Sequence, residues 1–235
     1  MGVMAEPGQD RRSRAPRARS VADSLTLAIH EHRLAPGLKL NEDEVGEIFG
    51  VSRTIVRSAL QMLAHDQLVS IEPNRGAFVA EPSIREAREV FEARALLEPR
   101  TARSAAERVT PADVTLLRRH NDEEHAALHR GDYGTALRLS GQFHLEIARI
   151  ADQATIAGFI AQLISRSSLV IALYWRRPNA MCETHAHEAL LGALARGDGP
   201  LAEDLMKGHL LDLLSLLDLR ETPPPPQSLR EALNG

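Results

Sequence analysis

The pattern of the sequence changes near residue 82, and this change constrains the fold more than any other feature. Before it, apolar residues recur at helical spacing, and two short runs at 68–72 and 77–80 alternate as strands do. After it, strand-like runs stop, and apolar residues keep helical spacing as far as residue 219. We therefore expect a mainly α-helical protein with a small mixed N-terminal domain and a larger all-helical C-terminal domain.

Residues 19–82 are expected to form a winged helix-turn-helix. Asn41 and Ser52 are residue types that cap helices, and Gly50 between them suits the left-handed conformation of a tight turn. The run 73–76 separates the two strand-like runs and ends in glycine, which is typical of a β-hairpin. The predicted helices of this domain cover residues 21–34, 42–48 and 53–65.

Residues 83–220 are expected to form an antiparallel all-helical bundle, because consecutive amphipathic helices must pack together to bury their apolar stripes. Its predicted helices cover residues 83–108, 111–130, 132–152, 154–175, 182–196 and 198–219. The arginine-rich segment 1–18 is expected to be a disordered basic arm. The segment 221–235 contains four consecutive prolines and is expected to be a frayed tail.

Composition excludes several classes of protein. The 235 residues include one cysteine, which rules out an internal disulfide and fits a reducing cytoplasm. No run of about 18 apolar residues predicts a membrane span. Aromatic residues make up 3% of the chain, too few for the stacking platforms that bind single-stranded nucleic acid. The net charge of −4 is no sign of nucleic-acid binding either, so such a role must come from local placement of charge.

The segment 50–60, GVSRTIVRSAL, has the pattern of a DNA-recognition helix. Hydroxyl residues and arginines at the start of such a helix can meet base edges and phosphates in the major groove. An arginine pair on an exposed helix is usually only solvated, but this pair follows a glycine turn and precedes a glycine-tipped hairpin. The candidate DNA-binding residues are Ser52, Arg53, Thr54 and Arg57 on the helix and Asn74, Arg75 and Gly76 at the hairpin tip.

Residues 25–80, with APGLKLNEDEVGEIFGVSRTIVRSALQMLAHDQLVSIEPNRGAFV at their centre, resemble the DNA-binding domain of the GntR family of bacterial transcription regulators. The resemblance implies that the candidate residues above contact an operator, with Arg75 and Gly76 at the tip of the wing. Two positions depart from the family pattern. Asp43 stands where similar proteins often carry arginine, which affects one phosphate or base contact, and Ser58 stands where they often carry glutamate.

Four segments of the helical part resemble the effector-binding domain of the FadR subfamily of the same family. They are residues 91–106, 139–152, 187–198 and 209–217, so the resemblance spans nearly the whole chain between its two ends. It implies that residues 83–220 bind a small organic acid and form a homodimer.

Three histidines, His144, His187 and His209, lie on the apolar stripes of three predicted helices. If these helices pack together, the imidazoles can converge and bind a divalent metal (Zn, Ni, Mn or Fe) through neutral nitrogens. The alternative for each histidine alone is a hydrogen-bonded core residue. In the domains that this one resembles, an aspartate four residues before the first histidine completes the metal site. Ser140, a weak neutral ligand, stands there, and Cys182 is either a replacement ligand or a small core residue.

Arg94 lies beside an apolar stripe, and a buried guanidinium needs a partner. That partner is either Glu98, one helical turn later, or the carboxylate of a bound ligand, and the sequence leaves both open. Because similar domains bind small organic acids, the resemblance implies an effector site. Its candidate residues are Arg94, Ser140, His144, His187 and His209.

These features predict a ligand-responsive regulator and not an enzyme. We expect a cytoplasmic homodimeric repressor that binds a palindromic operator in double-stranded DNA and is released by a small organic acid, together with a metal. One alternative is a regulator for which the metal itself is the signal. Another is a metal-dependent hydrolase with Glu146 or Glu188 as the base, although the sequence has no HExxH motif and no glycine-rich phosphate loop.

Overall fold

The computed structural model describes residues 7–175 and 184–220, with side chains at 15–175 and 186–220. These residues divide into two compact units. The first contains the chain up to Ile29 together with Arg33–Ala80, and the second contains His30–His32 and the chain from Glu81 onward. The predicted fold class is confirmed, because a winged helix-turn-helix is joined to an all-helical unit.

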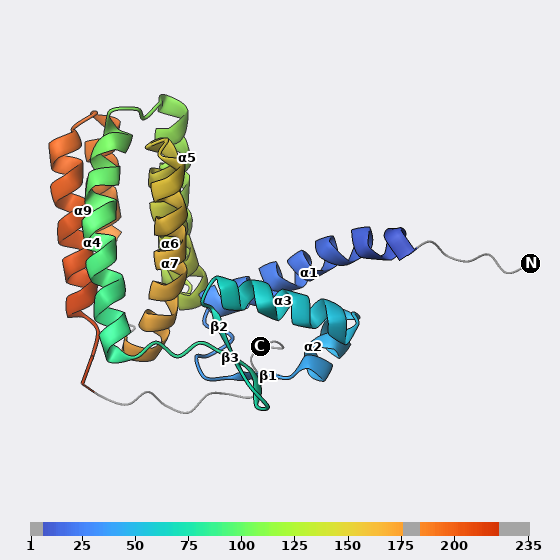
Figure 1. Cartoon of the computed structure of the whole chain (residues 1–235). Coiled ribbons are helices and arrows are strands. Elements are labelled where there is room, and N and C mark those ends of the chain that lie inside the picture. The colour runs from blue at the N-terminus through green and yellow to red at the C-terminus, as the bar shows by residue number, and fades with distance from the viewer. Residues whose placement is uncertain (1–6, 176–183, 221–235) are drawn as a thin grey trace, which may run out of the picture. The chain divides into compact units, whose positions relative to one another are not determined.

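The first unit is the winged helix-turn-helix (Figure 1). Its elements are α1 (Pro7–His30), β1 (Lys39–Leu40), α2 (Glu42–Phe49), α3 (Arg53–His65), β2 (Val69–Glu72) and β3 (Gly76–Val79). β3 lies between β1 and β2 and pairs antiparallel with both, so that Val69 lies opposite Val79. Leu25 of α1, Val45 of α2 and Leu60 of α3 are buried, which shows that each helix of this unit contributes an apolar side to its interior.

Two parts of this unit differ from the sequence-based expectation. α1 begins at Pro7, within the segment 1–18 expected to be disordered. Arginine and alanine, which are frequent there, have high helix propensity, and proline is tolerated in the first turn of a helix. β1 is absent from the prediction, because a strand of two residues is too short to show an alternating pattern.

The second unit is a helical bundle. Its described helices are α4 (Ile84–Ala106), α5 (Pro111–His129), α6 (Tyr133–Ile150), α7 (Ala154–Tyr174), α8 (Thr184–Ala195) and α9 (Gly199–Ser215). α4 contacts α6, α7, α8 and α9, and α5 packs against α6 and α8 (Figure 1). Phe91 of α4, Phe143 of α6 and Leu190 of α8 share one buried core, so the helices that carry the candidate site residues are packed closely together.

α7 is long and apolar enough to cross a membrane when judged by length and composition alone. In the structure it packs against α4 and α6, and Ile160, Val170 and Leu173 are buried. Three serines, at 165, 167 and 168, interrupt its apolar sequence and line a cavity of the bundle. The helix therefore has the character of a core helix, and its hydropathy is weak evidence for a membrane span.

A capping box begins α5, the helix that positions Glu124. The Thr110 hydroxyl oxygen accepts the Asp113 backbone N–H at 3.2 Å, and the Asp113 carboxylate accepts the Thr110 backbone N–H at 3.1 Å. These two bonds satisfy backbone donors that the first turn of a helix leaves unpaired. The start of α5 thus depends on the side chain of Thr110.

Thr110→Ala is expected to lower the free energy of unfolding of the second unit by about 1 kcal/mol, because it removes the N-cap acceptor. Urea unfolding followed by the fluorescence of Trp175, the only tryptophan, measures this. Thr115→Ala is the control, since that exposed hydroxyl only donates to the Pro111 carbonyl within the same helix. Equal destabilisation by the two substitutions would show that the cap is unimportant.

Candidate functional site

The turn between α2 and α3 depends on Gly50, which ends α2 with a φ of 61°. This left-handed conformation strains other residues but not glycine. Asn41 begins α2 by accepting the backbone N–H groups of Asp43 and Glu44, as its residue type predicts. Ser52 stands at the N-cap of α3, but its hydroxyl makes no capping hydrogen bond, which differs from the expectation. The hydroxyl instead lies exposed at the start of α3.

α3 separates its buried residues from its polar ones. Ile55, Val56 and Leu60 are buried, and they hold the helix against its own unit. The candidate DNA-binding residues of this helix and its N-cap are all exposed: Ser52, Arg53, Thr54 and Arg57. The structure therefore presents the predicted residues at the N-terminal part of α3, the part of a recognition helix that reads base edges.

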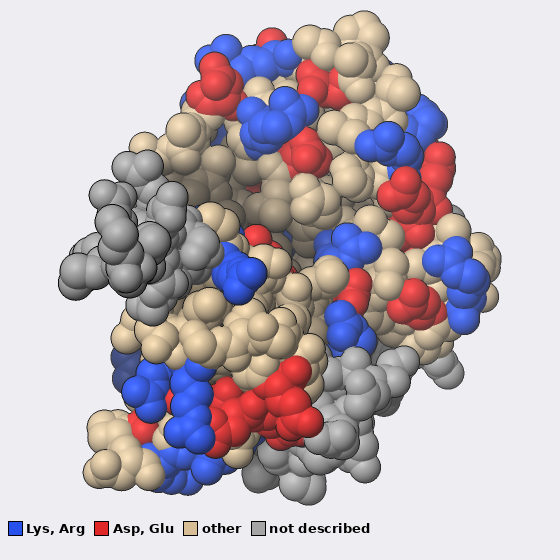
Figure 2. Space-filling model, turned by 90° about the vertical axis from the view of Figure 1, so that its right-hand side faces the viewer, with Lys and Arg blue, Asp and Glu red and all other residues tan. Residues whose placement is uncertain are grey.

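The two arginines of α3 are paired with acidic residues of α2. Nη2 of Arg53 donates to Oδ2 of Asp43 at 2.9 Å, and Nε of Arg57 donates to the Glu42 carboxylate at 2.8 Å. All these charges lie at or near the surface. Figure 2 shows, on the face that it draws, that Lys and Arg residues lie beside Asp and Glu residues. The first turn of α2 thus supplies the counter-charges of the candidate DNA-binding arginines.

The hairpin tip between β2 and β3 carries the remaining candidate DNA-binding residues. Asn74 and Gly76 have φ values of 62° and 106°, so the chain turns through left-handed conformations on both sides of Arg75. The Arg75 guanidinium is ion-paired with Glu72 and lies 5.5 Å from the centre of the Phe78 ring. All three tip residues are exposed, which is the placement expected of a wing.

The structure brings the three predicted histidines together in the bundle. His144 comes from α6, His187 from α8 and His209 from α9, and each is at least 95% buried. One nitrogen of each ring lies within 4.8 Å of the others, and the Nε2 atoms of His144 and His209 are 3.2 Å apart. Three neutral nitrogen donors at this separation form a cluster that can hold a divalent metal.

Two glutamates set the orientation of these rings. The Glu98 carboxylate accepts a hydrogen bond from Nδ1 of His144 at 2.6 Å, and Glu124 accepts one from Nδ1 of His187 at 2.9 Å. Protonated Nδ1 atoms leave the Nε2 lone pairs of both rings for the centre of the cluster. Nε2 of His187 is buried and has no hydrogen-bond partner among the described residues. A histidine that donates from one ring nitrogen to a carboxylate, and has the other ring nitrogen available, is in the usual environment of a metal ligand.

Burial favours the neutral form of two of the imidazoles, those of His144 and His209. It lowers the pKa of His144, although Glu98 opposes this effect, and it lowers the pKa of His209 further, assisted by the neighbouring rings. Burial also disfavours ionisation of Glu98, but Arg94 and His144 outweigh it and lower the pKa of Glu98 to about 2. An anionic glutamate beside neutral histidines is the protonation state that metal binding requires.

Arg94 has the partner that its spacing suggested. Its Nε donates to Oε1 of Glu98 at 2.5 Å, its Nη2 donates to Oε2 at 3.3 Å, and its Nη1 donates to the Ser167 hydroxyl at 3.0 Å. Both charged side chains are almost completely buried. Of the two partners left open by the sequence, the structure therefore shows Glu98, while Arg94 also lines the neighbouring cavity.

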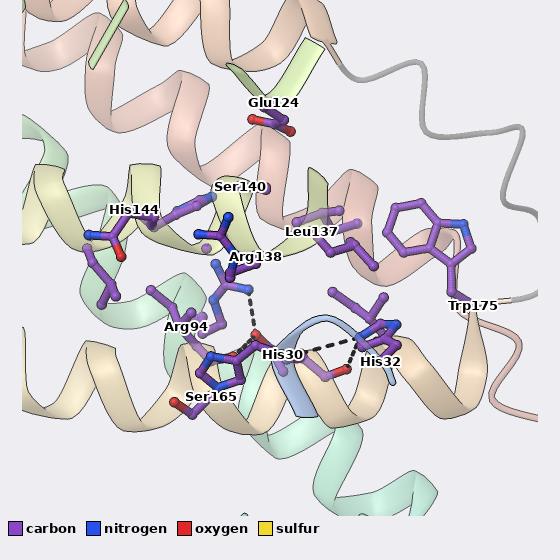
Figure 3. A pocket seen from close by; sticks show the side chains of 18 of the residues that line it. His30, His32, Arg94, Glu124, Leu137, Arg138, Ser140, His144, Ser165 and Trp175 are labelled. Carbon is purple, nitrogen blue, oxygen red and sulfur yellow. Dashed lines mark hydrogen bonds between the residues drawn. The ribbon is translucent and has the colours of Figure 1, made fainter. Parts of the chain in front are cut away.

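A cavity of about 110 Å³ adjoins the histidine cluster in the second unit (Figure 3). Arg94, Ser140, His144 and His209 of the predicted effector site line it, whereas His187 does not. The other polar lining residues are His30, His32, Glu124, Arg138, Gln142, Ser165, Ser167 and Ser168. The wall is thus rich in hydrogen-bonding groups, with Trp175 and His32 at one end in Figure 3. A cavity of this kind suits a small polar ligand.

The tripeptide His30–His32 is a part of the cavity wall that sequence reasoning missed. Nε2 of His32 donates to the Ser168 carbonyl at 3.0 Å, and Arg138 donates to Glu31 at 3.1 Å. Burial lowers the pKa of His32 to about 4, so its ring is neutral. Gly134 allows α6 to lie close to this tripeptide, because a Cβ at position 134 would lie 2.2 Å from the Glu31 carbonyl oxygen.

The other candidate residues are not brought into the site. Glu146 accepts hydrogen bonds from Gln142 and Arg149, and Glu188 accepts one from Asn121. Neither glutamate lines the cavity beside the histidine cluster. Cys182, the alternative metal ligand, lies outside the described residues.

The serines of α7 had a signal in the sequence. Ser165, Ser167 and Ser168, with Arg166 between them, interrupt a helix that is mostly apolar, and such a polar interruption indicates a polar cavity or partner. His30 and His32 had no such signal. His30 ends α1 and His32 lies two residues beyond it, and both line the cavity only because of the tertiary fold.

Comparisons with known families and proteins agree with this architecture. Residues 17–79 match the family described as bacterial regulatory proteins, gntR family, and residues 89–212 match the FCD domain. The chain is 29% identical over 183 residues to the HTH-type transcriptional repressor RspR of Escherichia coli K12, covering 77% of this chain and 79% of RspR. It is 26% identical over 211 residues to the HTH-type transcriptional regulator LutR of Bacillus subtilis, covering 80% and 95%.

Solved structures show the same fold. A putative GntR transcriptional regulator from Rhodococcus sp. RHA1 superposes with a TM-score of 0.75 at 25% identity, covering 85% of this chain and 96% of that one. E. coli McbR/YncC also gives a TM-score of 0.75, at 23% identity, with coverage of 85% and 97%. The relatives are transcription regulators, which confirms the prediction of a regulator rather than an enzyme. With the FCD match covering more than half of its length, this chain belongs to the GntR family of bacterial transcription regulators and carries an FCD domain.

Proposed function

We propose that this protein is a cytoplasmic, homodimeric repressor that leaves its operator when a small organic acid binds beside a metal in the FCD domain. The observation that carries the proposal is the polar cavity of about 110 Å³ next to three buried histidines. A bundle that served only as a scaffold would gain stability by filling this space with apolar side chains. The repressor role is further supported by RspR, a relative that is named as a repressor.

On DNA, we propose that α3 enters the major groove and the hairpin tip follows the adjacent backbone or minor groove. Ser52, Arg53, Thr54 and Arg57 form the exposed start of α3, and Asn74, Arg75 and Gly76 form the tip. A dimer places two such surfaces on the half-sites of a palindromic operator, because its two-fold axis matches that of the DNA. The ion pair of Arg57 with Glu42 lies at the surface, so a phosphate or base can replace it with little loss of stability.

In the FCD domain, we propose that His144, His187 and His209 hold a divalent metal such as Zn, Ni, Mn or Fe. The closeness of their ring nitrogens and the unpartnered Nε2 of His187 support this assignment. A bound ion would supply positive charge and open coordination positions for an anionic ligand. Because Ser140 stands where a carboxylate ligand is usual, the charge of the ion is not neutralised by its protein ligands.

The charges of the wall favour a carboxylate ligand only when the metal is present. Arg94 and Arg138, the cations of the wall, already have Glu98 and Glu31 as partners. Glu124 is a further acidic residue of the wall. Without an ion, an organic acid would therefore meet no unneutralised cation among the described lining residues. With one, Arg94, Ser140 and the histidines surround an electropositive centre.

The volume indicates the size of the ligand. An engineered cavity of about 150 Å³ accepts benzene, so about 110 Å³ suits a ligand of at most about six non-hydrogen atoms. A ligand there would touch His30 and His32, whose chain neighbours Ile29 and Arg33 belong to the DNA-binding unit. We propose that this tripeptide transmits ligand binding to the DNA-binding unit.

The histidine cluster also favours a second candidate function, a regulator for which the metal itself is the signal. The distinction is experimental, because a metal sensor changes its operator affinity on metal addition alone. In the leading proposal the metal stays bound, and the organic acid changes the affinity.

Arg53→Ala is expected to weaken binding to the duplex that the wild-type chain enriches from a random pool, by roughly 5- to 150-fold, because one arginine–base contact is lost. Gel shift measures this. Arg85→Ala is the control, since Arg85 is also exposed and paired with a glutamate but lies on α4. Unchanged binding by Arg53→Ala would exclude α3 as the reading element. An enriched sequence without two-fold symmetry would argue against the dimer.

His187→Ala is expected to weaken Zn²⁺ binding by at least about tenfold, since one of three ligands is removed. Calorimetry with zinc on the metal-free full chain measures the affinity. His129→Ala, an exposed histidine of α5, is the matched control and should bind like the wild type. Equal affinities for the two variants would place the metal elsewhere.

Metal-loaded protein is expected to gain thermal stability with small hydroxy acids such as lactate or glycolate, and chelation should abolish the gain. A ligand at 100 times its dissociation constant stabilises by about 2.7 kcal/mol, which for a chain of this size is a rise of roughly 5 to 11 °C in Tm. Lactamide, which lacks the charge, is the control and should have no effect. A chelator-resistant gain would contradict a metal-dependent carboxylate site.

A further inference from the structure

The contact between Asp43 and Arg53 joins the two side chains at two points. Nη2 of Arg53 donates to Oδ2 of Asp43 at 2.9 Å, while Nε forms an ion pair with Oδ1. One edge of the guanidinium therefore lies along the carboxylate. Since the guanidinium is planar and rigid, two contacts on one edge determine the plane of the whole group.

This arrangement leaves the opposite part of the group for another partner. A guanidinium has five N–H donors, and Arg53 meets Asp43 through a hydrogen bond from Nη2 and an ion-pair contact at Nε. Nη1 of Arg53 makes no hydrogen bond within the described part of the chain. The remaining N–H groups of Nη1 and Nη2 form a parallel pair. That pair matches O6 and N7 of guanine, the commonest base partner of arginine in the major groove.

The neighbouring pair between Glu42 and Arg57 differs in geometry. Both oxygens of Glu42 accept from the same atom, Nε of Arg57, at 2.9 and 2.8 Å. A contact through one nitrogen neutralises the charge but leaves the guanidinium freer to rotate. The two pairs thus share charge and helices, although Glu42 is less exposed than Asp43, and only the contact with Asp43 fixes a plane.

The Asp43 contact is held in place by the local fold. Asp43 lies in the first turn of α2, where its backbone N–H is bound by the cap residue Asn41 at 2.9 Å. Arg53 is the first residue of α3, at the end of the helix that reads bases. With side chains 62% and 70% exposed, the ion pair contributes little to stability. Its effect is on the orientation of Arg53.

We propose that Asp43 is a specificity-determining positioning residue, which holds Arg53 so that it selects guanine at one position of each half-site. The inference rests on the proposed function, in which α3 reads the operator. Asp43 also carries a negative charge close to the DNA backbone, so it lowers overall affinity while it raises selectivity. The combination of lower affinity and higher selectivity distinguishes a carboxylate that orients the arginine from one that only neutralises it.

The test is a selection of duplexes from a random pool by the full chain, followed by affinity measurements with single-base variants of the enriched duplex. Wild-type protein is expected to require guanine at one position per half-site, with roughly 5- to 150-fold discrimination. Asp43→Asn should bind the enriched duplex at least as tightly, and its discrimination at that one position should fall severalfold. Discrimination at the other positions should not change.

Two further variants serve as controls. Glu42→Gln removes the same charge one residue away, and it should raise affinity without changing base preference at the guanine position. Arg53→Lys keeps the positive charge but lacks the two parallel donors, so it should lose preference at the same position as Asp43→Asn. Circular dichroism of all variants should match the wild type, because the altered side chains are exposed or half-exposed.

The outcomes separate this inference from the proposed function. If the wild-type chain enriches no sequence, both are overturned. If it enriches a sequence, but Asp43→Asn keeps full discrimination at every position, only the role of Asp43 is overturned. Equal loss of base preference in Glu42→Gln, or an effect of Arg53→Lys at a different position, would also contradict it.

Discussion

The buried contact between Arg94 and Glu98 is the interaction on which the helical unit depends. Removing either charge from water is costly, and a buried pair is tolerated only when its hydrogen bonds are satisfied. Glu98 accepts from both Arg94 and His144, and Arg94 also donates to Ser167, so one network joins α4, α6 and α7. Because Glu98 orients the His144 ring, the same network determines where the three imidazoles meet.

Contacts between carboxylates and basic side chains have different consequences in the two units, because they are buried in one and exposed in the other. In the bundle, carboxylates hold Arg94 and His144 in single orientations, and breaking a pair would leave a charge without water. At the start of α3, carboxylates hold Arg53 and Arg57 at the surface, where water and salt weaken the attraction. The buried contacts therefore organise a lasting site, whereas, in the proposed function, the exposed pair of Arg57 can be exchanged for a contact with DNA.

Much of the fold was predictable because its signals are local. Gly50 and Asn41 mark the turn and a helix start through their own backbone preferences, and both do so in the structure. The histidines were recognisable because imidazoles on apolar stripes are unusual. Glu124 escaped notice, because a glutamate on a helix is normally solvated. Only the packing of α5 against α8 shows that it holds His187.

By itself the sequence determined the kinds of element, their order, and which faces of the helices are apolar, since these follow from periodicity and capping within a few residues. It also determined that Arg94 has Glu98 within reach on the same helix. Only the tertiary structure decided that this pair is buried and shared with His144, and that His30 and His32 line the cavity. Those contacts join residues as far as 136 positions apart, and their existence depends on how whole helices pack, which no local pattern specifies.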